Sequence, residues 1–542
     1  MDYDVIVLGT GAAGLTAAIT AHAHGARVGL FERGEQVGGT SAWSGGLVWI
    51  PNNPHMAELE IPDSRVEAIS YLMSMSQGML EETLIEAYVD AGPEMVSFIE
   101  SNSPVAFQIV QGFPDYHPEF PGGKTKGGRS LECPVFSFHE LGDWAARVTV
   151  GRQMNGNMTL GEGPLGGKLE LPPLELRQDR ASRDERGYGQ ALVGRLLKGC
   201  LDRGIEPHTE ARATDLVIEG GRVRGVRFEG PKGIFEVHAK GGVILATGGF
   251  EWNPALVKAF VRGPMTRPVS VPTNTGDGLK MAMKAGASLG NMREAWWVPT
   301  TDVPKAEGGG TWPYQVQSGK TKPHSIMVNR RGQRFTNEAA NYNTFGAAFH
   351  VIDVNTMEYV NHPAWIVCDA HYLARYGLGA HMPGSKAELP AWIAKGETLA
   401  ELAAAIGVPA AALEATVQRW NLNAAELRDP DFHRGESAHD LWWGDHAYEG
   451  AAATIGPLDT PPFYAVEVQS GALGTKGGPR TDTDGQVLDL EGEAIPGLYA
   501  AGNVMASAFG MTYGGAGGTL GPGMVFGYLS GKHAARAAAA AG

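Results

Sequence analysis

Cysteine, positive charge and long apolar runs are all scarce in this chain. Its 542 residues include three cysteines and no Cys-x-x-Cys pair, so neither a disulfide framework nor a cysteine metal site is expected. The formal net charge of −15 excludes the basic surface that nucleic acid or anionic lipid would require. The histidine-containing stretches 433–434 and 439–443 lack metal-ligand spacing and are predicted to lie on the surface. Neither a metal nor a nucleic-acid partner is therefore predicted.

No apolar stretch reaches the roughly 20 residues that a membrane-spanning helix needs. The first apolar run is preceded by acidic Asp2 and Asp4, whereas a signal peptide begins with basic residues, so a cytoplasmic location is the default expectation. A chain of 542 residues is too long for a single hydrophobic core, and two domains are expected.

Glycine, in contrast, is abundant, with 76 residues gathered at motif positions. Residues 9–14, GTGAAG, lie between a predicted buried strand and a predicted Ala-rich helix at 15–24. In such a motif Gly9 permits a tight turn, Gly11 lets the backbone approach a pyrophosphate, and Gly14 lets the helix pack closely on the strand. The helix N-terminus offers free N–H groups to the phosphates, so the motif predicts a dinucleotide site.

A second predicted strand, at 27–31, ends at Glu32, whose carboxylate can accept hydrogen bonds from a ribose. The small-residue loop at 35–46 can lie flat along a flavin ring and its ribityl chain. This loop resembles the corresponding segment of the succinate dehydrogenase/fumarate reductase flavoprotein superfamily. Members of that superfamily with covalently bound flavin carry a histidine near this point. Because no histidine occurs between His24 and His55, non-covalent FAD is expected.

The predicted FAD site is assembled from several separate segments. Its predicted elements are a β-hairpin around 213–223, buried strands at 242–249 and 497–503, a helix at 279–287 capped by Asn274 or Thr275, and a last helix at 519–541. The residues predicted to contact FAD are Gly9, Gly11, Ala12, Ala13, Gly14, Glu32, Arg33, Gly39, Thr40, Ser41, Ser44, Gly45, Gly46, Ala213, Ala246, Thr247, Gly248, Asn274, Gly276, Asp277, Gly502, Asn503, Gly518, Thr519 and Leu520.

The predicted fold class is α/β. A discontinuous Rossmann-like FAD-binding domain is expected from residues 1–292 and 471–542. The stretch between them, 293–470, is richer in Trp, Pro, His and charge, and is expected to be an inserted α+β substrate domain. Residues 151–184 show no clear pattern, and a lid, an oligomer contact and a surface excursion are all open for them.

Three tyrosines, Tyr116, Tyr342 and Tyr513, lie in three separate motifs, whereas Tyr499 and Tyr528 follow strand and helix patterns and are predicted to be core residues. The motifs are FPDY at 113–116, VNR at 328–330, NE at 337–338, LGTKGG at 473–478 and YGGAG at 513–517. Over almost the whole chain, this pattern resembles the flavin-dependent 3-ketosteroid Δ1-dehydrogenases. Those enzymes desaturate a cyclic ketone next to its carbonyl. The resemblance implies an active site of the three tyrosines and Gly517, and a 3-ketosteroid substrate.

Such a desaturation requires a polarised carbonyl, removal of an α-proton and departure of a β-hydride to flavin N5. The Tyr513 O–H and the Gly517 N–H can bind the carbonyl oxygen as an oxyanion hole. The resemblance implies that Tyr342 takes the α-proton and that Tyr116 supports it by hydrogen bonding, while His117 is not expected to be a base. Since only about one free tyrosine in a thousand is ionised at pH 7, a neighbour-lowered pKa and an activity optimum above neutral pH are expected.

Four alternatives are open. A small cyclohexanone-type ketone would suit the same mechanism. A fumarate-reductase-like enzyme is disfavoured because its His-Thr-x-Gly-Gly motif is replaced by residues 473–478, and its Gly-Glu by Gly502-Asn503. A 3-ketosteroid Δ4-(5α)-dehydrogenase would carry serine where this chain has Gly515. A non-catalytic flavin-binding protein is the fourth. The electron acceptor and the oligomeric state are not predicted.

Overall fold

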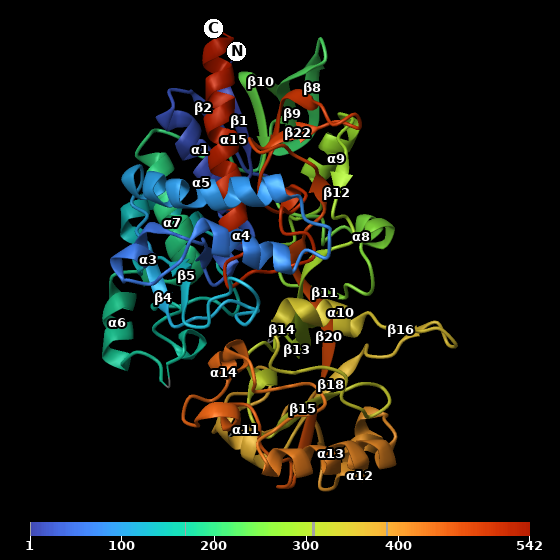
Figure 1. The fold of residues 1–542 in the computed structure, drawn as a ribbon. Coiled ribbons are helices and arrows are strands. Elements are labelled where there is room, and N and C mark those ends of the chain that lie inside the picture. The colour runs from blue at the N-terminus through green and yellow to red at the C-terminus, as the bar shows by residue number, and fades with distance from the viewer. Residues whose placement is uncertain (1, 169, 306–308, 386–387, 542) are drawn as a thin grey trace.

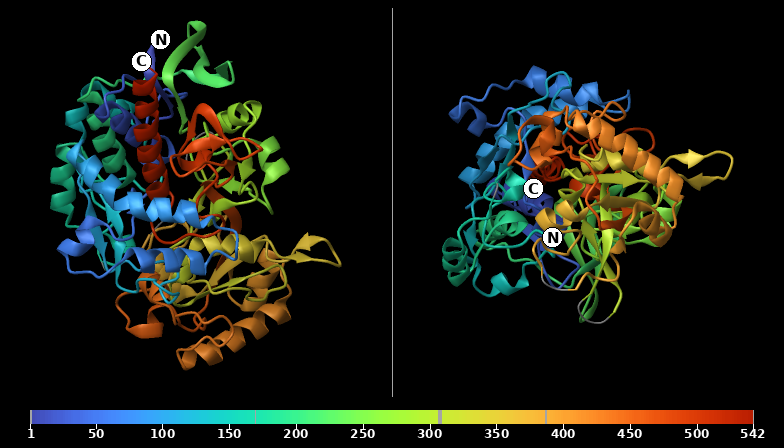
Figure 2. Two further views of the ribbon diagram at one scale, coloured as in Figure 1. Left: turned by 45° about the horizontal axis from the view of Figure 1, so that its top comes forward. Right: turned by 90° about the horizontal axis from the view of Figure 1, so that it is seen from below.

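Two sheets, one above the other in Figure 1, form the framework of the protein. The structure is a computed structural model that describes residues 2–168, 170–305, 309–385 and 388–541. The chain begins and ends at the same end of the molecule, beside the first sheet (Figures 1 and 2). The fold is of the mixed α/β type that the sequence predicts.

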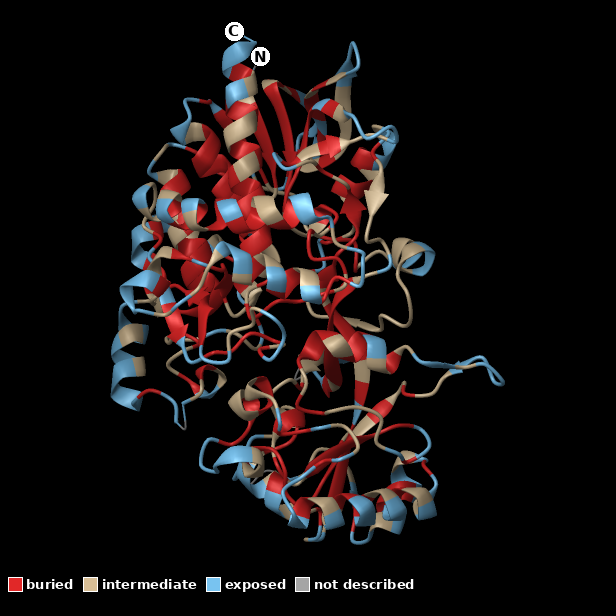
Figure 3. Cartoon of the chain, in the orientation of Figure 1, coloured by how far each residue is buried: buried red, intermediate tan, exposed pale blue. Residues whose placement is uncertain are grey.

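The first sheet is built on four parallel strands. β1 (Tyr3–Leu8) lies between β2 (Val28–Phe31) and β10 (Gly233–Leu245). On its other side, β10 pairs with β23 (Ala494–Ala500). β2 and residues 5–8 of β1 are apolar and buried, as is typical of parallel strands in α/β folds (Figure 3). The sheet is extended by antiparallel β22 (Gln486–Leu488) and by the predicted hairpin, β8 (Arg212–Glu219) and β9 (Arg222–Gly230).

Glycines set how closely the helices approach this sheet. A Cβ atom on Gly14 would come within 2.0 Å of the Gly9 carbonyl oxygen, so α1 (Ala12–Ala23) can pack on β1 only with glycine there. α15 (Leu520–Ala540) packs on α1 in the same way, because a Cβ on Gly527 would come within 2.4 Å of the Ala13 carbonyl oxygen. The first and last helices are thus in direct contact.

The second sheet is largely antiparallel and has a long central strand, β20 (Phe463–Thr475). Its order is β14 (Thr311–Gln315), β13 (Ala295–Pro304), β20, β18 (Ala364–Cys368) and β15 (Ser325–Val328). Two further short strands, β11 (Arg267–Pro268) and β19 (Ala394–Gly396), also pair with β20. α12 (Leu399–Ile406) and α13 (Ala410–Ala425) cover its lower part with a separate apolar core that includes Leu413, Val417 and Trp420.

The segment 151–184 leaves the first part of the chain and contacts the second sheet. The Gln315 backbone N–H donates to Gln153 Oε1 at 2.8 Å, and Gln153 Nε2 donates to the Gln315 carbonyl at 3.3 Å. Farther along, α6 (Leu174–Ser182) buries none of its residues, and Figure 3 shows it largely exposed. The segment is therefore a bridge at one end and a surface excursion at the other.

A β-hairpin arm of β16 (Ile352–Asp353) and β17 (Glu358–Tyr359) projects from the second sheet (Figure 1). Its side chains include exposed Val354 and Met357. Within the described part of the chain, no helix combines the length and the apolar character needed to cross a membrane.

Two expectations about local structure are wrong. The helix expected at 279–287 is α9 (Asp277–Lys284), and its N-cap is Gly276, without a capping side chain. Asn274 does not cap it because its amide donates to Thr40 and Glu251, and the Thr275 hydroxyl instead accepts from Arg33.

The second wrong expectation places residues 433–434 and 439–443 on the surface. His433 is exposed, but Arg434 and His439 are buried. Arg434 forms an ion pair with Glu338. Burial is possible because the Arg434 guanidinium also donates to the Ser325 and Lys322 carbonyls.

Candidate active site

A large cavity of about 310 Å³ lies between the two sheets and takes its lining from both. Leu8 and Gly523 are the outermost lining residues in the sequence, so the site is assembled from nearly the full length of the chain. All the predicted FAD and catalytic residues line it except three. The exceptions are Gly14, Gly276 and Gly518, which pack against Gly9, Phe250 and the Tyr513 ring, respectively.

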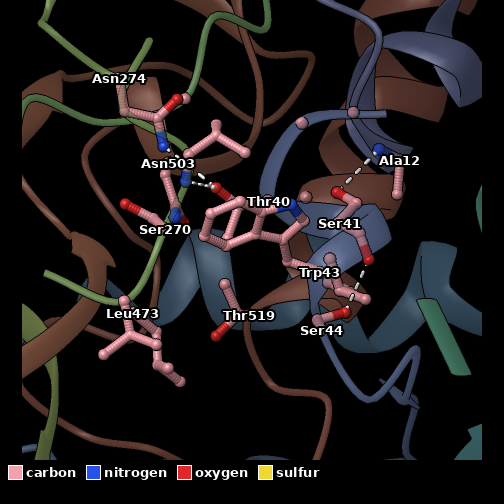
Figure 4. A pocket seen from close by; sticks show the side chains of 18 of the residues that line it. Ala12, Thr40, Ser41, Trp43, Ser44, Ser270, Asn274, Leu473, Asn503 and Thr519 are labelled. Atoms are coloured by element: carbon pink, nitrogen blue, oxygen red, sulfur yellow. Dashed lines mark hydrogen bonds between the residues drawn. The ribbon is translucent and has the colours of Figure 1, made fainter. Parts of the chain in front are cut away.

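The lining from the first sheet is shaped for phosphates. Among the described residues, no acceptor receives a hydrogen bond from the N–H groups of Gly11 and Ala13 at the start of α1. The neighbouring Ala12 N–H donates to Ser41 Oγ at 3.0 Å, as Figure 4 shows. Free amides at a helix N-terminus fit the pyrophosphate of a dinucleotide.

Small polar side chains hold the rest of this wall in place. Asn274 Nδ2 donates to Thr40 Oγ1 at 3.2 Å (Figure 4). Glu32 accepts the Thr10 hydroxyl at 2.6 Å. Arg33 and Asp277, both predicted to contact FAD, line the cavity but pair with each other at 3.1 Å.

The three tyrosines meet at the other end of the cavity, and all three are buried. Tyr116 lies with its ring centroid 5.4 Å from that of Tyr342 and 5.0 Å from that of Tyr513. The Tyr342 hydroxyl donates to the Tyr513 hydroxyl at 3.0 Å, and the Tyr513 hydroxyl lies 2.9 Å from Thr519 Oγ1. The sequence places these residues up to several hundred positions apart, and the fold brings them into one hydrogen-bonded cluster.

The backbone around Tyr513 depends on glycine because Trp49 packs directly against it. A Cβ on Gly515 would come within 2.3 Å of Trp49 Nε1, and that indole N–H donates to Asp115 at 2.8 Å. Gly517 has φ of 102°, a left-handed value that favours glycine. No acceptor among the described residues takes the Gly517 N–H, so it is available to a ligand in the cavity.

The expectation of a neighbour-lowered tyrosine pKa is wrong. Burial raises the pKa of Tyr342 well above its ordinary value, and Tyr116 and Tyr513 raise it further. Burial also raises the pKa values of Tyr116 and Tyr513. No lysine, arginine or charged histidine among the described residues contacts the hydroxyl of any of these three tyrosines, so desolvation decides the direction.

Sequence reasoning missed the residues behind Tyr116. The His439 ring lies 5.2 Å from the Tyr116 ring, and the Trp443 indole N–H donates to His439 Nε2 at 3.2 Å. Burial lowers the pKa of His439 well below its ordinary value, so the ring is neutral. His439 and Trp443 belong to α14 (Ala438–Trp443), and Trp443 also lines the cavity. The aromatic residues at 439–443 were the feature of the sequence that could have indicated a segment packed against the site.

Buried charged side chains hold the loop that carries Tyr342 in place. Lys320 Nζ donates to the Glu338 and Ala340 carbonyls, each at 2.6 Å. The Glu338 carboxylate pairs with Arg334 at 2.7 Å and with Arg434 at 3.2 Å. Removing one member of such a buried network is costly, so the loop is held rigidly.

One group of potential metal ligands lies outside the cavity. His324, Asp369 and His371 each offer a ligand atom within 4.8 Å of the others. None of the three lines the cavity, and His371 is exposed.

Comparison with known proteins identifies the class. A family model described as FAD binding domain matches residues 4–520, so the chain belongs to this family. It is an FAD-dependent oxidoreductase of the kind that acts on CH–CH groups, homologous to 3-oxosteroid 1-dehydrogenases.

Two relatives and one structure are especially similar. The 4-oxocyclohexanecarboxylate 2-dehydrogenase of Sinomonas cyclohexanicum is 41% identical, over 99% of this chain and 93% of that protein. The 3-oxosteroid 1-dehydrogenase of Mycobacterium tuberculosis is 37% identical, over 98% of each chain. The crystal structure of 3-ketosteroid delta1-dehydrogenase from Sterolibacterium denitrificans, in complex with 1,4-androstadiene-3,17-dione, matches with a TM-score of 0.92 at 35% identity and covers 98% of this chain and 99% of that one.

Gly9→Ala is expected to reduce FAD occupancy. Gly9 has φ of 107°, and its Cβ would come within 2.3 Å of the Ala246 carbonyl oxygen, so the turn must shift at the phosphate-binding amides. The ratio of flavin to protein absorbance after purification measures the effect. Gly25→Ala is the matched control, since Gly25 also has a positive φ but its Cβ would meet nothing within 4 Å. Equal flavin content in the two variants would contradict the prediction.

Proposed function

We propose that the protein binds a 3-ketosteroid in this cavity and desaturates it at the bond next to its carbonyl. The observation that carries the proposal is the cluster of Tyr116, Tyr342 and Tyr513 beside the free N–H of Gly517. Tyr513 and Gly517 supply two donors to one carbonyl oxygen, which polarises the ketone and acidifies its α-hydrogens. FAD, when bound, supplies the acceptor for the hydride.

Tyr342 is proposed to act as its phenolate, which takes the α-proton and becomes the neutral phenol, and Tyr116 is proposed to donate a hydrogen bond to that phenolate before the transfer. Tyr342 is in contact with both other tyrosines, so losing its proton leaves two hydroxyl neighbours that can turn toward the charge. The burial that raises its pKa also makes the phenolate a stronger base once formed.

The steroid assignment is supported by the apolar side chains around the tyrosines. Phe113 and Trp443, whose ring centroids are 5.7 Å apart, line the cavity with Tyr116 and Tyr342, and Leu160 and Leu165 also line it. Phe113 is itself stacked at 4.9 Å on Trp442, which makes this wall rigid. A rigid apolar wall suits a fused-ring hydrocarbon, whose orientation is then set by the oxyanion donors.

A second candidate substrate is a cyclohexanone that carries a carboxylate. Arg152 lines the cavity, stands over the Trp312 ring at 5.9 Å, and forms no ion pair with any described residue. A cationic group without an acidic partner at a cavity wall can bind a substrate carboxylate. The first relative above is named for such a keto acid.

Anaerobic bleaching of the flavin by each ketone decides between the two. We expect 4-androstene-3,17-dione to bleach the flavin rapidly and 4-oxocyclohexanecarboxylate to do so slowly or not at all. The reverse ranking would move the assignment to the keto acid, and no bleaching by either would overturn the proposed function.

Arg152→Gln tests the second candidate directly. If the keto acid is the substrate, losing the guanidinium should raise its KM by about tenfold or more, because a charge-assisted hydrogen bond contributes about 1.5–3 kcal/mol. Steroid turnover should be unchanged in the same variant. A keto acid KM that does not move would remove the observation that favours this candidate.

We also propose that residues 1–292 and 471–542 form a Rossmann-like FAD-binding domain, that 293–470 form an inserted substrate domain, and that FAD is held without a covalent bond. The parallel order β2-β1-β10-β23 supports the first assignment. Non-covalent binding is supported by the cavity lining, which within the described chain contains no histidine or cysteine. Flavin released by heat or acid denaturation would be the expected result.

A further inference from the structure

Lys476 is a fully buried lysine directly behind Tyr513. It follows β20, and its Nζ donates to the Thr512 carbonyl at 2.7 Å. The same nitrogen lies 4.0 Å from the centre of the Trp296 ring and 5.9 Å from that of Tyr513. The Trp296 and Tyr513 ring centroids are 4.7 Å apart and the rings are tilted by 59°, so lysine, tryptophan and tyrosine form one cluster.

No carboxylate in the described part of the chain lies within ion-pair distance of the Lys476 ammonium group. Glu294 is the acid that most strongly favours the ammonium form, but its carboxylate is paired with Arg262 at 2.5 Å. Glu251 is another acid near the end of this strand, but its carboxylate accepts the Thr475 N–H rather than pairing with Lys476. An unpaired cation in a protein interior is expensive, so its retention calls for a role beyond packing.

The position of Lys476 suits a role in holding the oxyanion donor. The carbonyl that Lys476 binds belongs to Thr512, the residue before Tyr513. Thr519 contacts the Tyr513 hydroxyl. Thr519 also lines a small cavity of about 20 Å³ together with Lys476 and Asn503. The Trp296 indole N–H donates to Asn503 Oδ1 at 3.0 Å, which fixes the ring beside both the lysine and the tyrosine.

Building on the function proposed above, we infer that Lys476 is a positioning residue for Tyr513. Its ammonium group fixes the backbone at Thr512 and stabilises the negative charge that develops on the carbonyl oxygen held by Tyr513. The Trp296 ring helps to hold this arrangement, because its face attracts the ammonium group and the ring also contacts Tyr513.

The charge on Lys476 depends on pH in a predictable direction. Burial lowers its pKa to about 7, with Glu294 and Arg262 acting in opposite senses. The ammonium form is therefore present below neutral pH and is lost above it. If the charge assists catalysis, removing it should matter at pH 6 and matter little at pH 9.

Two variants separate the charge from the hydrogen bond. Lys476→Met removes both, and Lys476→Gln removes the charge but keeps an amide donor for Thr512. We expect both variants to lower the rate of anaerobic flavin reduction by the steroid about tenfold at pH 6, and by less than about threefold at pH 9. Lys322→Met is the matched control, because Lys322 is a half-buried lysine whose pKa burial lowers, to about 8, and its Nζ donates to the Gly444 carbonyl, away from the tyrosines.

Thermal unfolding distinguishes this role from a purely structural one. The folded-state pKa of Lys476 is lowered, so wild-type stability falls as pH drops from the ordinary lysine pKa to about 7. Lys476→Met should therefore have a Tm at pH 6 equal to or above that of the wild type. A lower Tm with a pH-independent loss of activity, or full activity in Lys476→Gln at pH 6, would overturn the inference.

Tyr513→Phe in the same assay tells which claim has failed. If Tyr513→Phe is slow while the Lys476 variants are normal at both pH values, the inference about Lys476 is wrong and the proposed function stands. If Tyr513→Phe reacts at the wild-type rate, the proposed function itself is wrong.

Discussion

Tyr513→Phe should lower kcat for steroid desaturation by about 10²–10³-fold while leaving flavin bound, which is the usual cost of losing one oxyanion donor. The phenylalanine ring still fits between Trp296 and Tyr116, because only the hydroxyl is lost. The Gly517 N–H is then the one remaining donor to the carbonyl oxygen. Single-turnover bleaching of the flavin measures the loss in the chemical step without interference from product release.

Tyr499→Phe is the control for Tyr513→Phe. Tyr499 is also buried, and its hydroxyl is hydrogen-bonded at 3.0 Å to His533, but it does not line the cavity. Its loss should leave kcat unchanged and lower stability by about 1 kcal/mol. Equal losses of activity in both variants would show that the effect of Tyr513→Phe reflects a damaged fold rather than a missing donor.

Tyr342→Phe should have a still larger effect, with kcat reduced by about 10²–10⁴-fold, the usual range for loss of a general base. The pH profile carries the sharper test. Because the pKa of Tyr342 is raised, its phenolate fraction grows about tenfold with each pH unit throughout the neutral and alkaline range. The wild-type rate should climb with pH and reach no plateau below the ordinary tyrosine pKa. Tyr342→Phe should lose this slope.

Tyr116→Phe provides the companion measurement. With the hydroxyls arranged as in this structure, Tyr116 raises the pKa of Tyr342. If Tyr116 turns to donate a hydrogen bond to the Tyr342 phenolate, its removal instead raises that pKa and moves the rising limb to higher pH. The slope itself should remain. A wild-type profile that is flat from neutral to alkaline pH would exclude tyrosine as the base, whatever the activity of the two variants.

The parts of this site that sequence predicts are those set by local geometry. Gly9, Gly11 and Gly14 are required by the turn and by the contact of helix and strand, and their spacing is visible in one short segment. The tyrosines were found because each lies in a distinctive motif. Their arrangement as one cluster is a tertiary property and was only implied by resemblance.

The buried polar groups could not be predicted, because burial of a charge depends on partners far away in the chain. Arg434 can be buried because it pairs with Glu338 and donates to carbonyls in another segment. The sequence around position 434 does not indicate these partners. His439 and Lys476 are similar cases. The error in the tyrosine pKa has the same origin, since desolvation is a property of the whole packed cluster.

The contact of α1 with α15 has a consequence for how the protein is made. The phosphate-binding turn leaves the ribosome long before the helix that packs against it, and long before Thr519 and Leu520. Even with its glycine motif complete, a nascent chain has only one wall of the cavity. Capture of the flavin must therefore wait until α15 has been made, and a chain cut short before α15 would keep the glycine motif but lack the wall that faces it.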